Sequence, residues 1–279
     1  MASALRVVPS PARDRRAPLE IEGVIPASRL GVRPQPETIP TSIPQVDKLT
    51  GGVPRGGLTE IFGPASSGRT SLLLALLAQT TAREEVCALV DASDAFDPHS
   101  AAAAGVDLKR LLWVRCERKV SSSPFLVSRK NRASAEEREA RNEKLASVEQ
   151  ALRAADLLLQ AGGFGLVALD LGDIPSAVAC RVPLTSWFRF RRAVENTATA
   201  LVVIGQEASV KSCASLVLRT KHSAISTQQS ARAAGAKPTH TRLLHGMQSE
   251  VEVLNSRILQ HKPVRSATTL LESRASWVG

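Results

Sequence analysis

The stretch of sequence that decides the fold is LTEIFGPASSGRT, residues 58–70. Its first five residues, Leu58–Phe62, predict a buried strand, and the segment that follows Thr70 has the apolar spacing of a helix. A glycine-containing turn joins the two, which lets backbone N–H groups face inward at the positive end of the helix. The stretch therefore predicts a phosphate-binding loop between a strand and a helix.

The loop suggests a nucleotide site with a magnesium ion. Thr70 stands where a hydroxyl can hold Mg²⁺, and Asp170, at the end of another apolar run, is the acid expected to orient that ion. ATP with Mg²⁺ is therefore the expected cofactor, unless the loop is a relic that shapes the fold and binds nothing. The candidate cofactor-binding residues are Gly63, Pro64, Ala65, Ser66, Ser67, Gly68, Arg69, Thr70 and Ser71.

Arg69 departs from the pattern of a phosphate loop, which favours lysine at this position. Lysine places a compact ammonium on a thin stem, whereas arginine carries a larger planar fork that cannot take the same pose. We expect phosphate affinity to survive this change and the positioning needed for hydrolysis to be lost.

Short apolar runs recur along the chain and alternate with helical stretches. The expected strands are Leu58–Phe62, Cys87–Asp91, Leu111–Arg115, Leu166–Asp170 and Ala200–Gly205. Helical spacing marks Ser71–Gln79, Lys144–Ala161 and Trp187–Thr197. This order predicts an α/β fold: a mostly parallel twisted sheet with helices on both faces. Alternation in Val251–Arg257 and Ala267–Glu272 adds a C-terminal β-hairpin.

Changes in composition divide the chain into three parts. Residues 1–38 are rich in Pro, Arg and Ser and are expected to form a flexible basic arm, and residues 39–220 form the α/β domain. Within that domain, residues 117–144 are charged and predict an exposed insertion, either a solvated loop or a basic contact surface. Residues 221–279 are expected to be a polar linker, the hairpin and a tail. We therefore expect a chain cut after about residue 220 to lose partner binding and to keep a folded core.

Composition also narrows the class of protein. The formal net charge is +10, which fits either an anionic partner such as nucleic acid or a generally basic protein. The four cysteines lack the short paired spacing of a zinc site. No apolar run is long enough to cross a bilayer and no secretory signal is evident, so a cytoplasmic location without a membrane partner is expected.

Beyond the loop, several segments resemble the core of the RecA family. The resemblance covers about residues 39–220 and is specific over residues 39–110. It implies a RecA-like P-loop core in which Gln206 ends a strand and senses the γ-phosphate. The segments that carry it are Ile39–Leu49, Gly51–Gly56, Leu58–Gly68, Val90–Pro98, Gly105–Leu108 and Val203–Gln206.

The chain departs from ATP-hydrolysing recombinases at three places. Their catalytic glutamate after the second strand corresponds to Ser93, whose hydroxyl cannot act as a base at its ordinary pKa. Their long DNA-gripping loop after Gln206 is shortened here to a few residues. The basic pair of their C-terminal hairpin corresponds to Asn255 and Arg257, so one charge remains. The resemblance therefore implies weak or absent hydrolysis.

Three further segments are similar to the ImuA group, RecA-like accessory proteins of bacterial damage-induced mutagenesis. They are Leu111–Cys116, Val148–Arg153 and Trp187–Glu195. This likeness implies an adaptor in DNA repair and translesion synthesis within the SOS response, with a translesion polymerase complex as partner. Self-association and contact with single-stranded DNA are left open.

A DNA-dependent ATPase and recombinase that acts on single-stranded DNA is the alternative function. The segment Trp187–Arg192 interleaves aromatic residues with arginines, which suits nucleic acid. The preferred interpretation is a helix that turns Trp187, Phe190 and Val194 to the core and its arginines to solvent.

Overall fold

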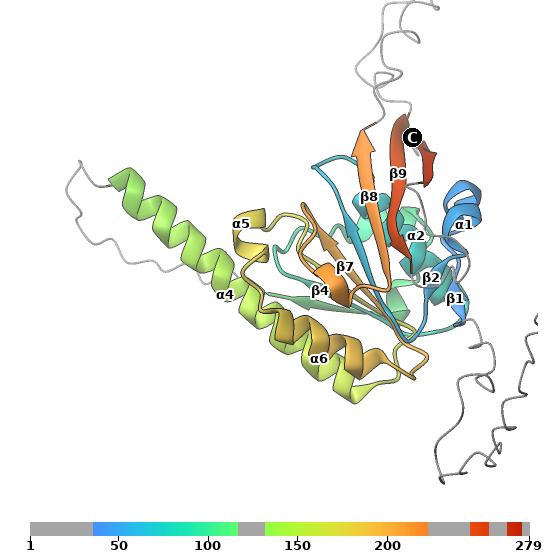
Figure 1. Cartoon of the computed structure of the whole chain (residues 1–279), viewed down its shortest axis with the longest axis horizontal. Helices are drawn as coiled ribbons and strands as arrows, with labels where there is room; N and C mark the ends of the chain where they lie inside the picture. The colour runs from blue at the N-terminus through green and yellow to red at the C-terminus, as the bar shows by residue number, and fades with distance from the viewer. Residues whose placement is uncertain (1–35, 117–131, 223–245, 257–266, 275–279) are drawn as a thin grey trace, which may run out of the picture. The chain divides into compact units, whose positions relative to one another are not determined.

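The computed structural model describes residues 36–116, 132–222, 246–256 and 267–274 (Figure 1). The expected arm therefore lies outside the described residues except at its end, where β1 (Thr38–Ile39) pairs antiparallel with β2 (Val53–Pro54). The helix α1 (Pro44–Thr50) connects these two strands. Residues 117–131 of the expected insertion also lie outside, so a basic contact surface there stays a prediction.

An eight-stranded sheet forms the centre of the described chain, in the order β10-β9-β8-β3-β7-β6-β4-β5. The pairs among β8, β3, β7, β6, β4 and β5 are all parallel, and β9 and β10 pair antiparallel. The predicted mostly parallel sheet is confirmed. The strands are β3 (Leu58–Phe62), β4 (Cys87–Asp91), β5 (Leu111–Arg115), β6 (Leu166–Asp170), β7 (Ala200–Gly205), β8 (Leu216–His222), β9 (Gly246–Ser256) and β10 (Ala267–Arg274).

Helices cover both faces of the sheet, as predicted. The helix α2 (Arg69–Ala82) packs through residues such as Leu72 and Leu76 against one face. On the other face lie α4 (Arg132–Ala161), α5 (Ser176–Ala179) and α6 (Leu184–Val194), with α4 and α6 side by side (Figure 1). Shorter helical elements are α3 (Pro98–Ala103) and the 3₁₀ segments Leu108–Arg110 and Lys211–Cys213.

Each central strand sends alternate residues to the two faces. Leu89 in β4 joins the cluster under α2, and its neighbours Ala88 and Val90 join the cluster under α4 and α6. Because both faces are buried, the strands read as continuous apolar runs. All five strands predicted from those runs have the observed bounds.

The basic helix α6 turns its aromatic residues inward. Trp187, Phe190 and Val194 are buried, and the Trp187 and Phe190 rings pack edge to face at 6.0 Å. Arg189 points outward and pairs with Asp156 of α4 at 3.0 Å. This confirms the inward face predicted for the helix, although the helix ends at Val194 and not at Thr197.

The C-terminal hairpin belongs to the main sheet. The strand β9 pairs with β8, and Val251 and Val253 are fully buried in the cluster under α2. The boundary expected after residue 220 falls inside β8, which continues to His222. In the described part of the chain, no helix combines the length and apolar character needed to cross a membrane.

Candidate nucleotide-binding site

The loop between β3 and α2 has the geometry of an anion site. Gly68 precedes α2 with φ of 93°, a left-handed conformation that favours glycine, and its carbonyl accepts the Leu72 N–H at 3.1 Å. Among the described residues, no side chain caps the first turn of α2, so its leading N–H groups remain available to an anion. Thr70 is exposed and Ser71 is half-buried at this end of the helix.

Strand β8 supports the loop from the side. The hydroxyl oxygens of Ser67 and Thr220 lie 2.6 Å apart, and both residues are fully buried. A Cβ on Gly63 would lie 2.2 Å from the Thr220 carbonyl oxygen, so only glycine fits there. His222 Nε2 lies 2.8 Å from the Ala65 carbonyl oxygen, which can only accept, so the ring donates. No local sequence signal identifies these contacts, because β8 lies far from the loop along the chain.

The Arg69 side chain packs against the sheet where β6 and β7 end. The residue is 7% exposed, and its Nη1 donates to the Gly205 carbonyl at 2.8 Å and to the Gly172 carbonyl at 3.2 Å. The guanidinium thus joins the segments that follow β6 and end β7. Burial lowers the pKa of Arg69, and the charges of Asp170 and Asp173 oppose this effect. The side chain stays protonated, because arginine does not lose its proton in proteins.

Asp170 faces the same space as Arg69. Its carboxylate accepts the Gly172 N–H at 2.7 Å, and burial raises its pKa to about 6. A Cβ built on Gly172 would lie 2.9 Å from Asp170 Oδ1 and 3.7 Å from Arg69 Nη1. The Asp170 and Arg69 side chains therefore both border the space next to Gly172. Gln206 Nε2 donates to the Gly172 carbonyl at 3.1 Å, which is the oxygen that Arg69 also uses. The expected phosphate sensor is thus bonded to the same oxygen as the loop cation.

The structure brings Arg69, Thr70 and Asp170 to one pocket of about 170 Å³. Gln206 borders it through its bond to Gly172. The other lining residues are Leu73, Leu74, Ala95, Phe96, Asp97, Ser100, Gly172, Asp173 and Ile204.

Ser93, the residue at the expected base position, lines a different and smaller hollow. Its hydroxyl oxygen is buried and has no hydrogen-bond partner among the described residues. The adjacent Asp94 pairs with Arg115 through two bonds of 2.6 and 2.7 Å. Neither side chain lines the pocket that contains Thr70 and Asp170. Around Ser93 and Asp94 lie Ala92, Cys116, Glu143, Lys144 and Ser147.

Asp91 is a buried carboxylate that was not among the predicted site residues. It lies opposite Asp170 on the neighbouring strand and is 1% exposed. Its oxygens accept the N–H groups of Ser93 at 3.0 Å and Phe96 at 2.9 Å, and the indole N–H of Trp113 at 3.4 Å. These bonds shape the turn after β4, which through Phe96 forms a wall of the pocket that also contains Arg69, Thr70 and Asp170. Asp91 ends an apolar strand, as Asp170 does, and this position in the sequence could have marked it as a candidate site residue.

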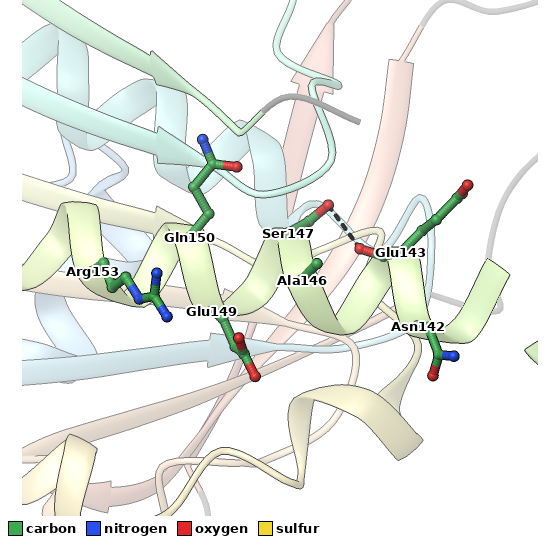
Figure 2. Close-up of a pocket in the computed structure, with 7 residues that line it drawn as sticks. All are labelled: Asn142, Glu143, Ala146, Ser147, Glu149, Gln150 and Arg153. Carbon is green, nitrogen blue, oxygen red and sulfur yellow. Dashed lines mark hydrogen bonds between the residues drawn. The ribbon is translucent and has the colours of Figure 1, made fainter. Parts of the chain in front are cut away.

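A larger hollow follows the surface of α4 (Figure 2). Among the residues drawn, the one hydrogen bond runs from the Ser147 hydroxyl to the Glu143 carbonyl at 3.1 Å. Both signs of charge occur there, and none of its residues was predicted as a site residue. They are Asn142, Glu143, Ala146, Ser147, Glu149, Gln150 and Arg153.

The residues of the pocket fit a nucleotide phosphate better than a magnesium ion. Free N–H groups at the start of α2 and a buried guanidinium both suit an anion. Mg²⁺ requires oxygen ligands in a near-octahedral shell. Thr70 and Asp170 could supply two such oxygens, but the Arg69 guanidinium lines the same pocket and interacts electrostatically with the Asp170 carboxylate. With Arg69 in this position, the pocket does not fit the ion.

The fold and the loop define an α/β protein of the P-loop class. Comparison with known proteins agrees: the profile of the RecA N-terminal domain matches residues 32–119. A RecA protein of Kineococcus radiotolerans is 34% identical over 196 residues, which are 64% of this chain and 48% of that protein.

Two other RecA proteins are also similar to this chain over part of their length. That of Synechococcus sp. (strain CC9902) is 48% identical over 87 residues, 31% of this chain and 22% of its own length. That of Wigglesworthia glossinidia brevipalpis is 28% identical over 186 residues, 61% of this chain and 47% of its own length. Residues 32–119 of this chain thus match the RecA N-terminal domain, and up to 64% of the chain is similar to RecA proteins. The chain spans between about a fifth and about half of the length of these relatives.

Proposed function

We propose that this chain is a RecA-like nucleotide-binding accessory protein in bacterial DNA repair. In this proposal it serves as an adaptor in damage-induced translesion synthesis, as its likeness to the ImuA group implies, and it hydrolyses ATP slowly or not at all. Two observations support the proposal: the loop before α2 leaves the first turn of that helix without a side-chain cap, and Ser93 stands where the family has its catalytic glutamate.

The nucleotide part of the proposal rests on residues 63–71. The start of α2 offers N–H groups to the phosphates, and Thr70 offers a hydroxyl on the same turn. Gln206 is the proposed γ-phosphate sensor, because its amide reaches the segment after β6 that borders the pocket. ATP is the proposed ligand.

Slow hydrolysis follows from the surroundings of Ser93. A water molecule needs a carboxylate or another base to accept its proton during attack. The nearest carboxylate in sequence, Asp94, is held by Arg115 at 2.6 Å and does not line the pocket. The position of the family's catalytic glutamate therefore supplies no carboxylate to this pocket.

The segment after Gln206 supports an adaptor more than a recombinase. Glu60, buried in β3, accepts the N–H groups of Ser209 at 2.6 Å and Val210 at 2.9 Å. A short segment held in this way offers no long loop to surround single-stranded DNA. We therefore propose a protein partner, a translesion polymerase complex, as the principal one.

Titration of the purified full chain with a fluorescent ATP analogue tests this proposal, with phosphate release followed with and without single-stranded DNA. We expect binding without turnover, and an affinity roughly tenfold lower in Thr70→Ala because a hydroxyl bond to a charged phosphate is lost.

Two other results would point elsewhere. Turnover stimulated by DNA would restore the recombinase and overturn the assignment of Ser93. Absence of binding would remove the nucleotide from the proposal and leave the loop as a structural relic.

A further inference from the structure

The phosphate pocket of this chain contains its own cation. Arg69 is 7% exposed, yet its side chain lies in the pocket wall beside Thr70 and Asp170. A buried charge is costly unless opposite charges or hydrogen bonds compensate it. Here the compensation comes from the carbonyl oxygens of Gly172 and Gly205 and from the negative charges of Asp170 and Asp173.

The guanidinium retains donors for an additional ligand. Both of its hydrogen bonds within the described residues are made by Nη1, at 2.8 and 3.2 Å. Nε and Nη2 donate to no atom in that part of the chain. A planar guanidinium with two free donor groups matches a phosphate, which it can bind through two parallel bonds.

The same arrangement disfavours a divalent cation. Mg²⁺ held by Asp170 would share the pocket with the Arg69 guanidinium, whose charge already acts on this carboxylate. The two cations would repel each other at short range in a partly buried pocket, where water screens charges weakly.

We propose that Arg69 takes the place of Mg²⁺ as the counter-cation of the phosphate site, so that the loop binds a nucleotide polyphosphate without a divalent ion. This inference rests on the proposed nucleotide binding and specifies the chemical form of the ligand. It revises the magnesium site that the sequence suggested at Thr70 and Asp170. The guanidinium neutralises phosphate charge, but unlike a metal ion it does not coordinate and orient the attacking water. This agrees with slow hydrolysis.

The test is the affinity of the full chain for a fluorescent ATP analogue, measured in Mg²⁺ and in excess EDTA. For the natural sequence we expect the two dissociation constants to agree within about twofold. For Arg69→Lys, which has a compact ammonium and leaves space beside Asp170, we expect affinity in Mg²⁺ at least about tenfold higher than in EDTA.

Arg83→Lys is the matched control, because Arg83 lies exposed at the other end of α2. It should behave like the natural chain in both buffers.

Each other outcome has a distinct meaning. If the natural chain requires Mg²⁺, the inference is wrong and the proposed function stands. If Arg69→Lys binds equally well in EDTA, Arg69 is not the counter-cation and the inference also fails. If the natural chain binds in neither buffer, the nucleotide part of the proposed function fails together with the inference.

Discussion

At the scale of one residue, the pocket changes the pKa of Asp170. Burial raises its pKa from 3.8 to about 6, and the Gly172 N–H and the Arg69 guanidinium only partly oppose this rise. The folded chain therefore binds a proton at Asp170 more tightly than the unfolded chain does. Stability from this group is present at low pH and decreases as the pH rises.

This difference predicts a pH dependence of unfolding. Between pH 4 and pH 6, Asp170 should reduce the free energy of unfolding by up to about 3 kcal/mol, and Asp170→Asn should lack this loss. Urea unfolding of both chains at about pH 4.5 and pH 7 checks it. Parallel pH profiles for the two chains would show that Asp170 does not titrate in this way.

At the scale of elements, the phosphate loop depends on β8 as much as on β3 and α2. The Ser67 and Thr220 hydroxyls form a buried pair, and Thr220 Oγ1 also donates to the Phe62 carbonyl at 3.3 Å. A buried hydroxyl that loses its partner costs about 1–3 kcal/mol. The strand should therefore hold the loop in its shape before any ligand binds.

A double-mutant cycle with Ser67→Ala and Thr220→Val measures this link. Each single change should lower the free energy of unfolding by about 1–2 kcal/mol, and the two costs should couple by about 1 kcal/mol. Thr59→Val is the matched control, because the buried Thr59 hydroxyl has no partner among the described residues. It should be neutral or stabilising. Additive costs for the pair would mean that the hydroxyls act independently.

At the scale of the whole molecule, the hairpin completes the core. Val251 and Val253 are fully buried under the same helix that follows the phosphate loop. Glu252, between them, accepts hydrogen bonds from Arg219 at 3.0 Å and lies 2.8 Å from Lys221. Residues after 220 are thus part of the sheet, and we no longer expect a chain cut there to keep a folded core.

Neighbouring residues of β9 test this conclusion without truncation. Val253→Ala should lower the free energy of unfolding by about 2–3 kcal/mol, because it leaves a cavity in the core. Leu254→Ala is the matched control: Leu254 is 39% exposed, and its loss should cost less than about 1 kcal/mol. Denaturant titration of both variants gives the comparison. Equal small effects would indicate a hairpin that packs loosely on an independent core.

The sequence by itself determined the α/β class, the five central strands and the position of the loop between β3 and α2. These features are local: a strand buried on both faces is apolar along its length, and a turn that points its N–H groups inward before a helix favours glycine. The inward face of α6 was predictable for the same reason, since its spacing fixes which residues share a side.

Only the tertiary structure decided what surrounds the loop. The bonds from Arg69 to Gly172 and Gly205, and the contact between Ser67 and Thr220, join segments that lie far apart in the chain. Which strands become neighbours depends on the order β8-β3-β7-β6, and no local pattern encodes that order. The charge around Asp170 follows in part from this order, because Asp91 comes from the neighbouring strand and Arg69 from α2.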